Sequence, residues 1–456
     1  MADANERAQA ARLLEAVICQ HQTTDQSFGN QTVTSLVSEL VYGTLRHYFS
    51  LTEALDRHLS RPLRSKDQDL YCLMLVGAYQ LRHLRIPAHA AVHATVDGCR
   101  TLRKPWAAKL VNAVLRAMAA EASAAEPESA QNERSFELPD WLKARLEAEY
   151  GGRAPALMGG LLKRAPMCLR VNQTRTSVTD YTTRLNEAGI AHRPGWMPES
   201  LYLEVPVPAR KLPGLASGEV SIQDAGALFA CGLLTRPHAA NPYAPDLQTA
   251  DHRPPSGEAQ DILDACAAPG GKLFHLAEAC PDASLWGVEL SRSRLEHLRT
   301  EARRLGHNQV NLIEGDATEQ TWWPGQAFDA ILLDAPCSGT GTLRRHPDIK
   351  ILLAPERLTE YAGLQSALLR NLWQMLRPGG VLVYCTCSLL EAENDAVIGA
   401  FLAETADAAI APFALPTGIP TRHGWQLLPG IEPPAAPALS TDGFYYARLF
   451  RRHKAG

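Results

Sequence analysis

The 456-residue sequence lacks the features that mark membrane, secreted and zinc-stabilised proteins. Its longest apolar stretch, near Leu70–Leu81, is shorter than the ~20 residues that a membrane-spanning helix needs. Residues 1–7 have neither the basic start nor the apolar core of a signal peptide. The ten cysteines include no Cys-x-x-Cys pair and are too few for a disulfide framework in a chain of this length. We therefore expect a cytoplasmic protein with reduced thiols, no membrane association and no metal.

The sequence also has little excess charge of either sign. Its formal net charge is −4, which excludes a general electrostatic attraction to nucleic acid, so a nucleic-acid site must be a local basic patch. Residues 1–120 contain 14 Lys and Arg residues against 10 Asp and Glu residues. Three basic clusters, each of which alone is typical of a solvated helix face, together favour a phosphate-facing surface. They are Arg61, Arg64 and Lys66; Arg82 and Arg85; and Arg100, Arg103 and Lys104.

Length and periodicity predict three folded regions. Residues 1–135 begin with apolar residues at helical spacing, which predicts an all-α bundle followed by a polar linker at 121–138. Residues 136–235 mix helices with short strands, which predicts a small α+β domain. Residues 261–456 alternate between strand and helix, which predicts a parallel α/β sheet with helices on both faces. Residues 236–260 are rich in Pro, Ala and Asp, and we interpret them as an insertion or linker.

The same patterns predict individual elements. In the middle region we expect strands at Cys168–Asn172, Ser200–Val205 and Glu219–Gln223, with a helix at Val178–Ala188. In the last region we expect strands at Ile262–Asp264, Ser284–Val288, Gln309–Ile313, Ala330–Leu333 and Val381–Tyr384. A helix at Leu364–Arg377 is expected to stop at Pro378-Gly379-Gly380, and Trp425–Leu428 with Gly443–Arg448 to form a terminal hairpin.

The stretch Phe328–Gly341 contains the first candidate site. Its apolar run is bounded by two aspartates and is typical of a strand buried on both faces. Asp334-Ala-Pro-Cys337 follows, and then two glycines. Ligands of open α/β sheets bind beyond the carboxyl ends of the strands, so a carboxylate and a thiol are expected at a binding crevice. An ordinary aspartate turn beside a small buried cysteine explains this stretch, taken alone, equally well.

Carboxylates also end the neighbouring predicted strands, and a glycine-rich loop follows the first strand. The loop from Cys266 to Lys272 lets a ligand approach the backbone at a helix N-terminus, but its spacing is neither the dinucleotide fingerprint nor a P-loop. Glu289 stands 25 residues after Asp264, where an acid suits the hydroxyls of a ribose. Each acid alone is more typical of a turn or helix cap. Together they favour a nucleoside cofactor without a pyrophosphate, such as S-adenosylmethionine.

Two successive strands deliver thiols to the same crevice, Cys337 from one and Cys385 or Cys387 from the next. Buried core cysteines are the common alternative. Beside a methyl donor, however, two thiols suggest methylation of an unreactive carbon such as cytosine C5. A thiolate that adds to C6 makes C5 electron-rich, an acid such as Asp334 stabilises the adduct near N3, and a base must then remove the C5 proton. The nucleophile needs local activation because a free thiol has a pKa near ~8.5.

The residues that carry this chemistry resemble the motifs of the RNA cytosine-C5 methyltransferases. These are Asp264–Lys272, Asp334–Gly341, Arg344–Lys350, and Thr386-Cys-Ser388 followed by Glu393-Asn394. The helical region, with Tyr42–Arg46 and Lys109–Arg116, is similar to the RNA-binding domain of the antitermination factor NusB. This pairing resembles the bacterial members of the family that methylate 16S rRNA, and the resemblance covers nearly the whole chain.

The resemblance implies a role for each matching residue and a monomeric enzyme that acts on 16S rRNA. Cys387 would be the nucleophile, Cys337 would help to release the product and Asp334 would assist catalysis. The S-adenosylmethionine site would consist of Cys266, Ala267, Ala268, Pro269, Gly270, Gly271, Lys272, Glu289, Asp316 and Asp334. In the middle region we expect Arg170 and Asn172 to contact RNA. Beyond the Cys337 loop we expect contacts with RNA phosphates from Arg344, Arg345, His346 and Lys350. The alternative for this second group is a surface salt-bridge cluster.

The sequence departs from the family pattern in three places. Glu289 stands where Asp is more usual, Cys385 is an extra thiol on the same strand face as Cys387, and residues 236–260 form a longer segment than is normal. Three other functions stay open. The protein can be a methyltransferase for another rRNA or a tRNA, a non-catalytic RNA-binding scaffold, or a DNA methyltransferase.

Overall fold

The computed structural model describes residues 2–124, 136–235 and 260–453, apart from Asn30, Thr32 and Pro437. Contacts divide the chain into two compact units. Unit 1 contains Met1–Ala148 and Leu343–Ala354, and unit 2 contains Glu149–Thr342 and Pro355–Gly456. Apart from Gln260, the predicted insertion 236–260 lies outside the described residues, as does most of the linker predicted at 121–138.

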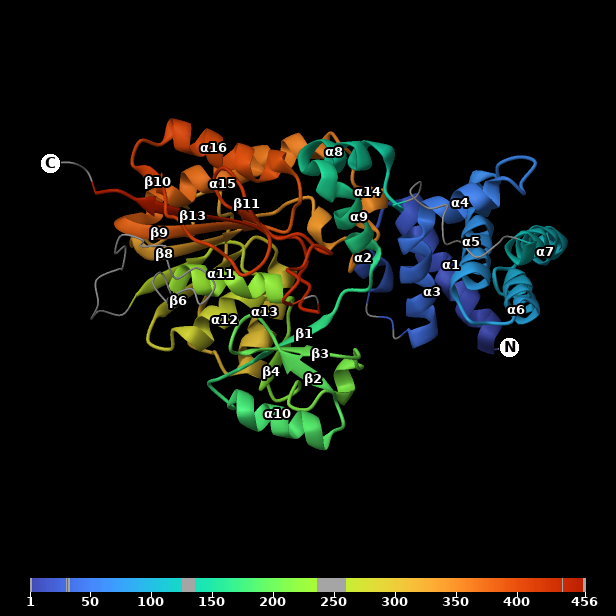
Figure 1. The fold of residues 1–456 in the computed structure, drawn as a ribbon, viewed down its shortest axis with the longest axis horizontal. Helices are drawn as coiled ribbons and strands as arrows, with labels where there is room; N and C mark the ends of the chain where they lie inside the picture. Colours follow the sequence, from blue (N-terminus) through green and yellow to red (C-terminus); the bar gives the residue numbers. More distant parts are fainter. Residues whose placement is uncertain are drawn as a thin grey trace. The chain divides into compact units, whose positions relative to one another are not determined.

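Unit 1 is all-α in its described residues, as predicted (Figure 1). α5 is its central helix, with Leu70 and Cys72–Gln80 buried, so the longest apolar run of the chain is the core helix of this bundle. The helices are α1 (Ala2–Gln20), α2 (Thr24–Phe28), α3 (Ser35–Arg46), α4 (Tyr48–Asp56), α5 (Gln68–His83), α6 (Ala88–Thr101), α7 (Ala108–Ala124), most of α8 (Asp140–Tyr150), and α14 (Ile349–Leu352). The 3-10 turns η1 (Ser65–Asp67) and η2 (Pro105–Ala107) precede α5 and α7.

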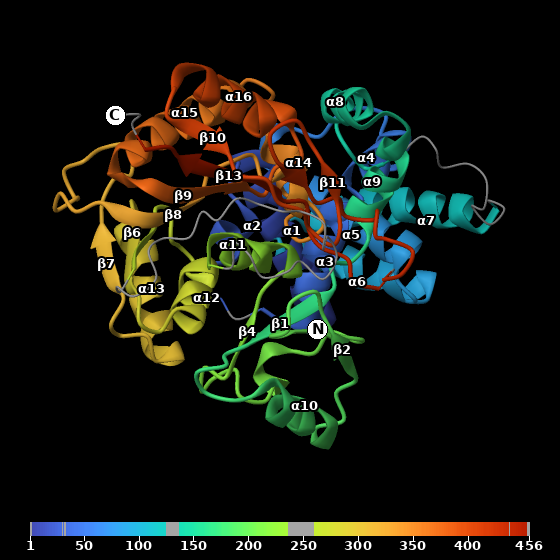
Figure 2. The same ribbon diagram turned by 60° about the vertical axis from the view of Figure 1, so that its left-hand side comes forward.

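The first part of unit 2 is a small α+β region. Its antiparallel sheet has the strand order β2-β3-β1-β4, and α10 packs on it through Tyr181 and Leu185 (Figure 2). The elements are η3 (Gly151–Arg153), α9 (Ala154–Leu162), β1 (Met167–Val171), α10 (Val178–Glu187), β2 (His192–Pro194), β3 (Ser200–Leu203), η4 (Ala209–Lys211), β4 (Val220–Ile222) and α11 (Ala225–Thr235).

The rest of unit 2 is a mixed sheet with the order β11-β12-β13-β9-β8-β5-β6-β7, and β10 pairs with β13. β7, β6, β5, β8 and β9 are parallel neighbours, and antiparallel β13 extends the sheet beyond β9. The strands are β5 (Asp261–Asp264), β6 (Ser284–Glu289), β7 (Asn311–Glu314), β8 (Phe328–Asp334), β9 (Leu376–Thr386), β10 (Ala408–Ile410), β11 (Ile419–Pro420), β12 (Trp425–Gln426) and β13 (Tyr445–Arg451). The helical elements are α12 (Gly271–Ala279), α13 (Arg292–Leu305), η5 (Thr340–Thr342), α15 (Arg357–Met375), η6 (Glu391–Glu393) and α16 (Asp395–Glu404).

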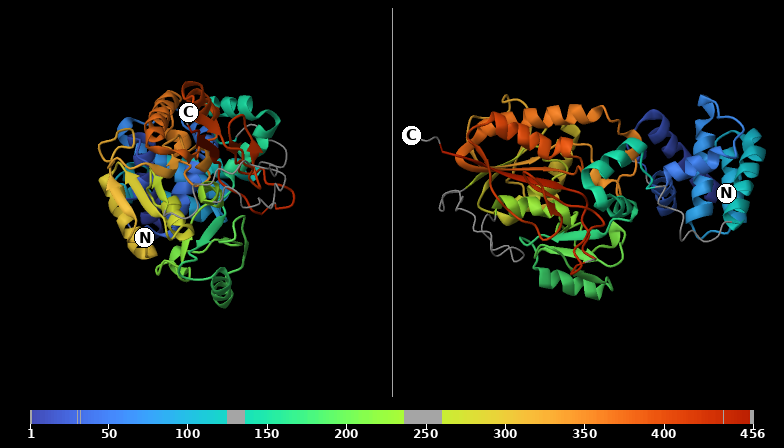
Figure 3. Two further views of the ribbon diagram at one scale, coloured as in Figure 1. Left: turned by 90° about the vertical axis from the view of Figure 1, so that its left-hand side faces the viewer. Right: turned by 45° about the horizontal axis from the view of Figure 1, so that its top comes forward.

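Both faces of this sheet are covered, which explains the continuous apolar runs in its strands. Alternate strand residues face opposite sides: Ile262 and Leu332 pack with α11, α12 and α13, whereas Leu263 and Leu333 pack with α15 and α16. Figure 3 shows the two helical layers on opposite sides of the strands. The strand order reverses at β5 and β8, and the crevice at such a switch point is where open α/β sheets bind ligands.

The fold class predicted from the sequence is confirmed, with differences in detail. The expected terminal hairpin exists as β12 and β13, but β13 also pairs with β9, so the sheet is mixed and not purely parallel. α15 begins at Arg357 instead of Leu364. Pro378-Gly379-Gly380 does not lie between the helix and the strand, because β9 begins at Leu376 and includes these three residues. The pairing of this part of β9 with β8 is irregular, with a register shift between Phe328 and Ala330. Within the described part of the chain, no helix combines the length and the apolarity that a bilayer crossing requires.

Candidate active site

The glycine-rich loop lies between β5 and α12 at the switch point of the sheet. Gly270 adopts a φ of 101°, a left-handed conformation that favours glycine, and a Cβ atom there would lie 2.5 Å from the Phe274 ring. α12 begins at Gly271, so its first backbone N–H groups lie at the carboxyl end of β5. The loop therefore combines a close backbone approach with the positive end of a helix.

Three predicted carboxylates stand at the ends of the parallel strands. Glu289 is the last residue of β6, is 3% exposed, and accepts a 2.9 Å hydrogen bond from the Ser291 N–H. Asp316 follows β7 by two residues and accepts hydrogen bonds from the backbone and the hydroxyl of Thr318. Asp334 is the last residue of β8. Because these strands are parallel neighbours around β5, their carboxyl ends lie on one edge of the sheet.

Asp264, the last residue of β5, also lies at this edge of the sheet and was not among the predicted site residues. Its side chain is 1% exposed, and its Oδ1 atom is buried without a hydrogen-bond partner among the described residues. Burial and then the charge of Asp334 raise the pKa of Asp264 to about 7. An unsatisfied buried carboxyl oxygen at the switch point is a feature of a site that receives a polar ligand. The only sequence signal was its place at the start of the glycine-rich motif.

Lys272 and Asp334 form an ion pair across the crevice. The Lys272 Nζ atom lies 2.6 Å from Asp334 Oδ2 and 5.2 Å from the centre of the Phe444 ring. Burial opposes the charge of Lys272, but the Asp334 carboxylate raises the pKa of this lysine above its usual range, and Cys385 and Cys387 act in the same direction. Lys272 therefore stays charged over the neutral pH range, and its bond to Asp334 joins the glycine-rich loop to the end of β8.

The two thiols predicted to meet do so: Cys337 Sγ lies 3.4 Å from Cys387 Sγ. Cys337 belongs to the loop after β8, and Cys387 follows the last residue of β9 directly. Both are partly buried. The hydrogen bond to Cys387, together with burial, raises the pKa of Cys337 well above its usual range.

The extra thiol, Cys385, has a different environment. It is fully buried, and its Sγ donates a 3.3 Å hydrogen bond to Asp334 Oδ1. Burial and the Asp334 charge raise the pKa of Cys385 well above its usual range. A protonated, solvent-shielded thiol is a poor nucleophile, so Cys387 is a better candidate for the nucleophile than Cys385.

Three family models match successive parts of the chain. Residues 4–120 match the NusB family, residues 138–210 match the RsmF/B-like ferredoxin-like domain, and residues 254–450 match the 16S rRNA methyltransferase RsmB/F family. A protein of Citrobacter koseri named ribosomal RNA small subunit methyltransferase B is 38% identical over 98% of this chain and 99% of its own length. The chain belongs to the ribosomal RNA small subunit methyltransferase B family.

Further relatives agree with this membership in the methyltransferase B family. A Xylella fastidiosa protein with the same name is 39% identical over 98% of this chain and 97% of its own length. The solved structure of PH0851 covers 98% of this chain and 99% of that chain with a TM-score of 0.78 at 20% identity, which shows a shared fold. A methyltransferase homolog from Pyrococcus horikoshii, 27% identical, covers 70% of this chain and 96% of that chain with a TM-score of 0.57.

In this methyltransferase B family member, two residues expected to bind RNA are structural. Arg170 is 1% exposed and forms two hydrogen bonds with the Glu278 carboxylate of α12, at 2.9 and 2.7 Å. Asn172 is also 1% exposed and donates to the carbonyl oxygens of Gly218 and Leu305. Both side chains join the α+β region to the helices of the large sheet. The expectation of RNA contacts from Arg170 and Asn172 is corrected accordingly.

The basic stretch after the Cys337 loop is also largely buried. Arg344 and Lys350 are 3% and 5% exposed, and both lie in the segment Leu343–Ala354 of unit 1. Lys350 Nζ donates a 2.6 Å hydrogen bond to the Arg46 carbonyl oxygen, and Arg46 donates to the Arg344 carbonyl oxygen. Buried side chains held in this way do not contact RNA phosphates. Arg345 and His346 are partly exposed and stay candidates for such contacts.

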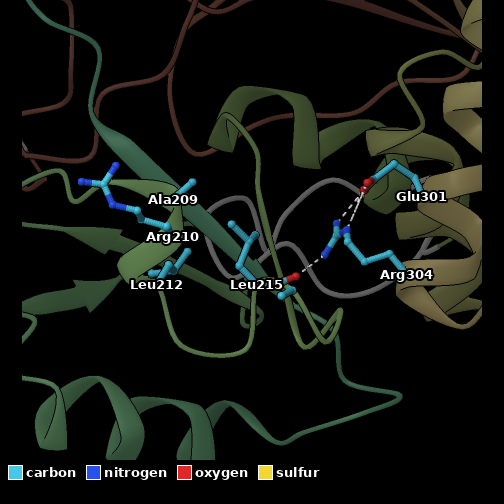
Figure 4. Close-up of a pocket in the computed structure, with 7 residues that line it drawn as sticks. Ala209, Arg210, Leu212, Leu215, Glu301 and Arg304 are labelled. Carbon is cyan, nitrogen blue, oxygen red and sulfur yellow. Dashed lines mark hydrogen bonds and ion pairs between the residues drawn. The ribbon is translucent and has the colours of Figure 1, made fainter. Parts of the chain in front are cut away.

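A separate surface hollow lies between η4 and α13, and it contains no predicted site residue (Figure 4). Arg304 crosses it, bound to the Glu301 carboxylate at 2.6 Å and to the Leu215 carbonyl oxygen at 2.6 Å. The lining residues are Ala209, Arg210, Leu212, Leu215, Ala216, Glu301 and Arg304. Because its best-placed cation is already bound within the protein, we interpret the hollow as a seam between the α+β region and α13.

Proposed function

We propose that this protein transfers a methyl group from S-adenosylmethionine to C5 of a cytosine in 16S rRNA through a covalent adduct with Cys387. The observation that carries the proposal is the 3.4 Å approach of the Cys337 and Cys387 sulfurs. Asp334, which is bonded to Lys272, also accepts a hydrogen bond from Cys385, two residues before Cys387. Membership of the methyltransferase B family supports 16S rRNA as the substrate.

The residues of the crevice fit S-adenosylmethionine. The partnerless Oδ1 of Asp264, the left-handed turn at Gly270 and the buried Glu289 carboxylate suit a polar, cationic nucleoside. When bound, the cofactor supplies an electrophilic methyl group. The residues proposed to hold it are Asp264, Cys266, Ala267, Ala268, Pro269, Gly270, Gly271, Lys272, Glu289, Asp316 and Asp334.

The chemistry of the protein side chains begins with nucleophilic attack. The Cys387 thiolate forms a bond to C6 of the cytosine, and the electron pair of the C5–C6 double bond moves into the ring towards N3. Asp334, paired with Lys272, stabilises this ring near N3. C5 then carries the electron density that accepts the methyl group.

Product release requires a base and a leaving group. Cys337, as a thiolate, accepts the C5 proton, the C5–C6 double bond re-forms, and the electron pair of the S–C6 bond returns to Cys387. Because its raised pKa keeps Cys337 protonated at neutral pH, this thiol must first release its own proton to solvent before it can accept the C5 proton. The short distance between the two sulfurs suits groups that act on adjacent ring atoms.

The test is methyl transfer to small-subunit rRNA by the full-length protein and two cysteine variants. We expect Cys387→Ala to abolish transfer, and Cys337→Ala to accumulate a protein–RNA adduct that survives denaturing electrophoresis. Cys280→Ala, at a partly buried thiol outside this crevice, serves as the control. Accumulation of the adduct by Cys387→Ala would reverse the two assignments. Wild-type protein that binds S-adenosylmethionine but transfers methyl groups to no RNA would overturn the proposal.

Parallel reactions with 16S rRNA, 23S rRNA, tRNA and DNA identify the substrate class. We expect the modified base to be 5-methylcytidine, found by nuclease digestion and mass spectrometry, and to come only from 16S rRNA. Preferential methylation of tRNA, 23S rRNA or DNA would contradict the 16S assignment while leaving the covalent mechanism in place. The monomeric state expected from the family resemblance stays a prediction.

A further inference from the structure

One buried carboxylate, that of Glu393 in η6, binds the residue that follows each active-site thiol. Ser338 follows Cys337, and it donates its backbone N–H to Glu393 Oε1 at 2.7 Å and its hydroxyl to Oε2 at 2.6 Å. Ser388 follows Cys387, and its hydroxyl donates to the same Oε2 atom at 2.5 Å. Glu393 is 0% exposed, so these contacts are shielded from water. The carboxylate therefore joins the loop after β8 to the loop after β9.

The two loops have further contacts around this carboxylate. The Ser338 and Ser388 hydroxyls lie 3.2 Å apart, and Thr340 Oγ1 lies 3.3 Å from each of them. Thr340 Oγ1 also accepts the Leu389 N–H at 2.9 Å. These polar atoms form one buried network with Glu393 at its centre.

The position of Glu393 is itself fixed by β9. The Tyr384 hydroxyl donates a 2.6 Å hydrogen bond to the Glu393 carbonyl oxygen. The next residue, Asn394, donates to the Ser388 carbonyl oxygen at 3.0 Å and accepts from the Thr386 hydroxyl at 2.6 Å. These hydrogen bonds are short and shielded from water, so this network resists separation of the loops.

We propose that Glu393 is a positioning residue that sets the spacing between Cys337 and Cys387. Its role is to keep Cys337 within reach of the C5 proton while Cys387 is bonded to C6. The inference rests on the proposed covalent mechanism and adds a residue to which that mechanism assigns no role. The negative charge of Glu393 also adds to the effects of the Cys387 hydrogen bond and burial, which raise the pKa of Cys337.

The test separates adduct formation from adduct release in the full-length protein. Glu393→Gln keeps the size of the side chain but has only one acceptor oxygen where the carboxylate has two. We expect adduct formation with rRNA, in a single turnover, within about threefold of wild type and release at least ~10-fold slower, because small misplacements of reacting groups are costly. The variant should therefore accumulate the adduct on denaturing gels. Glu391→Gln changes an exposed glutamate of the same short turn and should behave as wild type.

Two serine variants provide a second readout. Ser338→Ala removes the hydroxyl next to Cys337, so we expect its main effect to be slower release, with adduct formation near the wild-type rate. Ser388→Ala removes the hydroxyl next to Cys387, so we expect its main effect to be slower adduct formation. If Glu393→Gln is unstable, as measured by its melting temperature, the serine variants decide the question.

The proposal is overturned if a folded Glu393→Gln protein releases product at the wild-type rate, or if neither serine variant changes the ratio of the two rates. These outcomes differ from failure of the proposed function. In that case wild-type protein itself would form no adduct and transfer no methyl group.

Discussion

Asp264 shows how a single buried acid links the site to stability. Its pKa is raised to about 7, above the ~3.9 of an unfolded aspartate, so the folded protein binds the proton more tightly. The contribution of Asp264 protonation to the free energy of unfolding is complete below pH ~4 and is lost as the pH rises towards and through 7. We expect Asp264→Asn to raise the free energy of unfolding at pH 8 by about 1–3 kcal/mol and to flatten its dependence between pH 5 and 8.

Urea denaturation at pH 5 and pH 8, without cofactor, measures this effect. Asp282→Asn, at an exposed aspartate in the turn before β6, is the matched control and should change neither value. The same Asp264 variant should bind S-adenosylmethionine more weakly in calorimetry. An Asp264→Asn protein that is less stable than wild type at pH 8 would show that the ionised carboxylate is satisfied in the folded state.

At the residue scale, the sequence predicted where polar groups gather but not what each of them touches. The convergence of Cys337 and Cys387 followed from two strand ends, because neighbouring parallel strands must end at one edge. The burial of Asp264 and the network around Glu393 depend on contacts between distant segments, and a sequence pattern carries no record of them. Arg170 was predicted to contact RNA because its partner in the folded protein, Glu278, is 108 residues away in the sequence and could not be recognised from it.

At the scale of elements, the pair of Arg170 and Glu278 joins β1 to α12. Both side chains are nearly fully buried, and the Arg170 guanidinium holds the pKa of Glu278 below its usual value against the opposing effect of burial. Arg170→Met leaves Glu278 without its cation, and we expect it to destabilise the protein by about 3–5 kcal/mol. The double variant Arg170→Met, Glu278→Leu should recover most of this loss, because it removes both buried charges.

Chemical denaturation of the two single variants and the double variant measures the coupling. Arg193→Met, at a partly exposed arginine of β2, is the control and should have little effect. RNA affinity per folded molecule should be unchanged in all of them. Arg170→Met that folds normally but loses RNA binding would restore the role that the family resemblance implied.

The elements that the sequence predicted best are those with the clearest apolar pattern. β5, β6, β8 and β9 were found because a strand buried on both faces forms a short apolar run. β7 lies at the edge of the sheet, and its residues are partly or fully exposed. α11 was missed because nearly all of its residues are buried, so it has no polar face to give a helical period. The end of α15 was misplaced because Pro378 and the two glycines usually stop a helix, whereas here they lie inside the irregular start of β9.

At the scale of the whole molecule, unit 1 is discontinuous. Leu343–Ala354 contributes Ile351 and Leu352 to the edge of its core, and Lys350 is buried beside Arg46 and Glu137. Burial lowers the pKa of Lys350 to about 7, against the effect of Glu137 and with that of Arg46. A lysine whose folded pKa lies below its unfolded value costs stability at low pH, and this cost disappears as the pH rises from ~7 towards 10.

We therefore expect wild-type protein to gain thermal stability between pH 7 and pH 9.5, relative to Lys350→Met, which lacks this titration. Melting temperatures at the two pH values measure the difference. Lys109→Met, at an exposed lysine of α7, should leave the pH dependence as it is in wild type. Equal pH dependence in wild type and Lys350→Met would mean that Lys350 keeps its charge in the folded protein.

The discontinuity of unit 1 limits how this protein can be taken apart. The chain passes between the two units at residues 148/149, 342/343 and 354/355, and the second passage comes five residues after Cys337. A gene fragment that encodes only residues 1–148 lacks Leu343–Ala354, which packs against the core of the helical bundle. A fragment that begins at residue 149 encodes this segment without the bundle. Neither fragment encodes a complete unit, so we expect recombination to exchange the coding regions of the two units together and not one at a time.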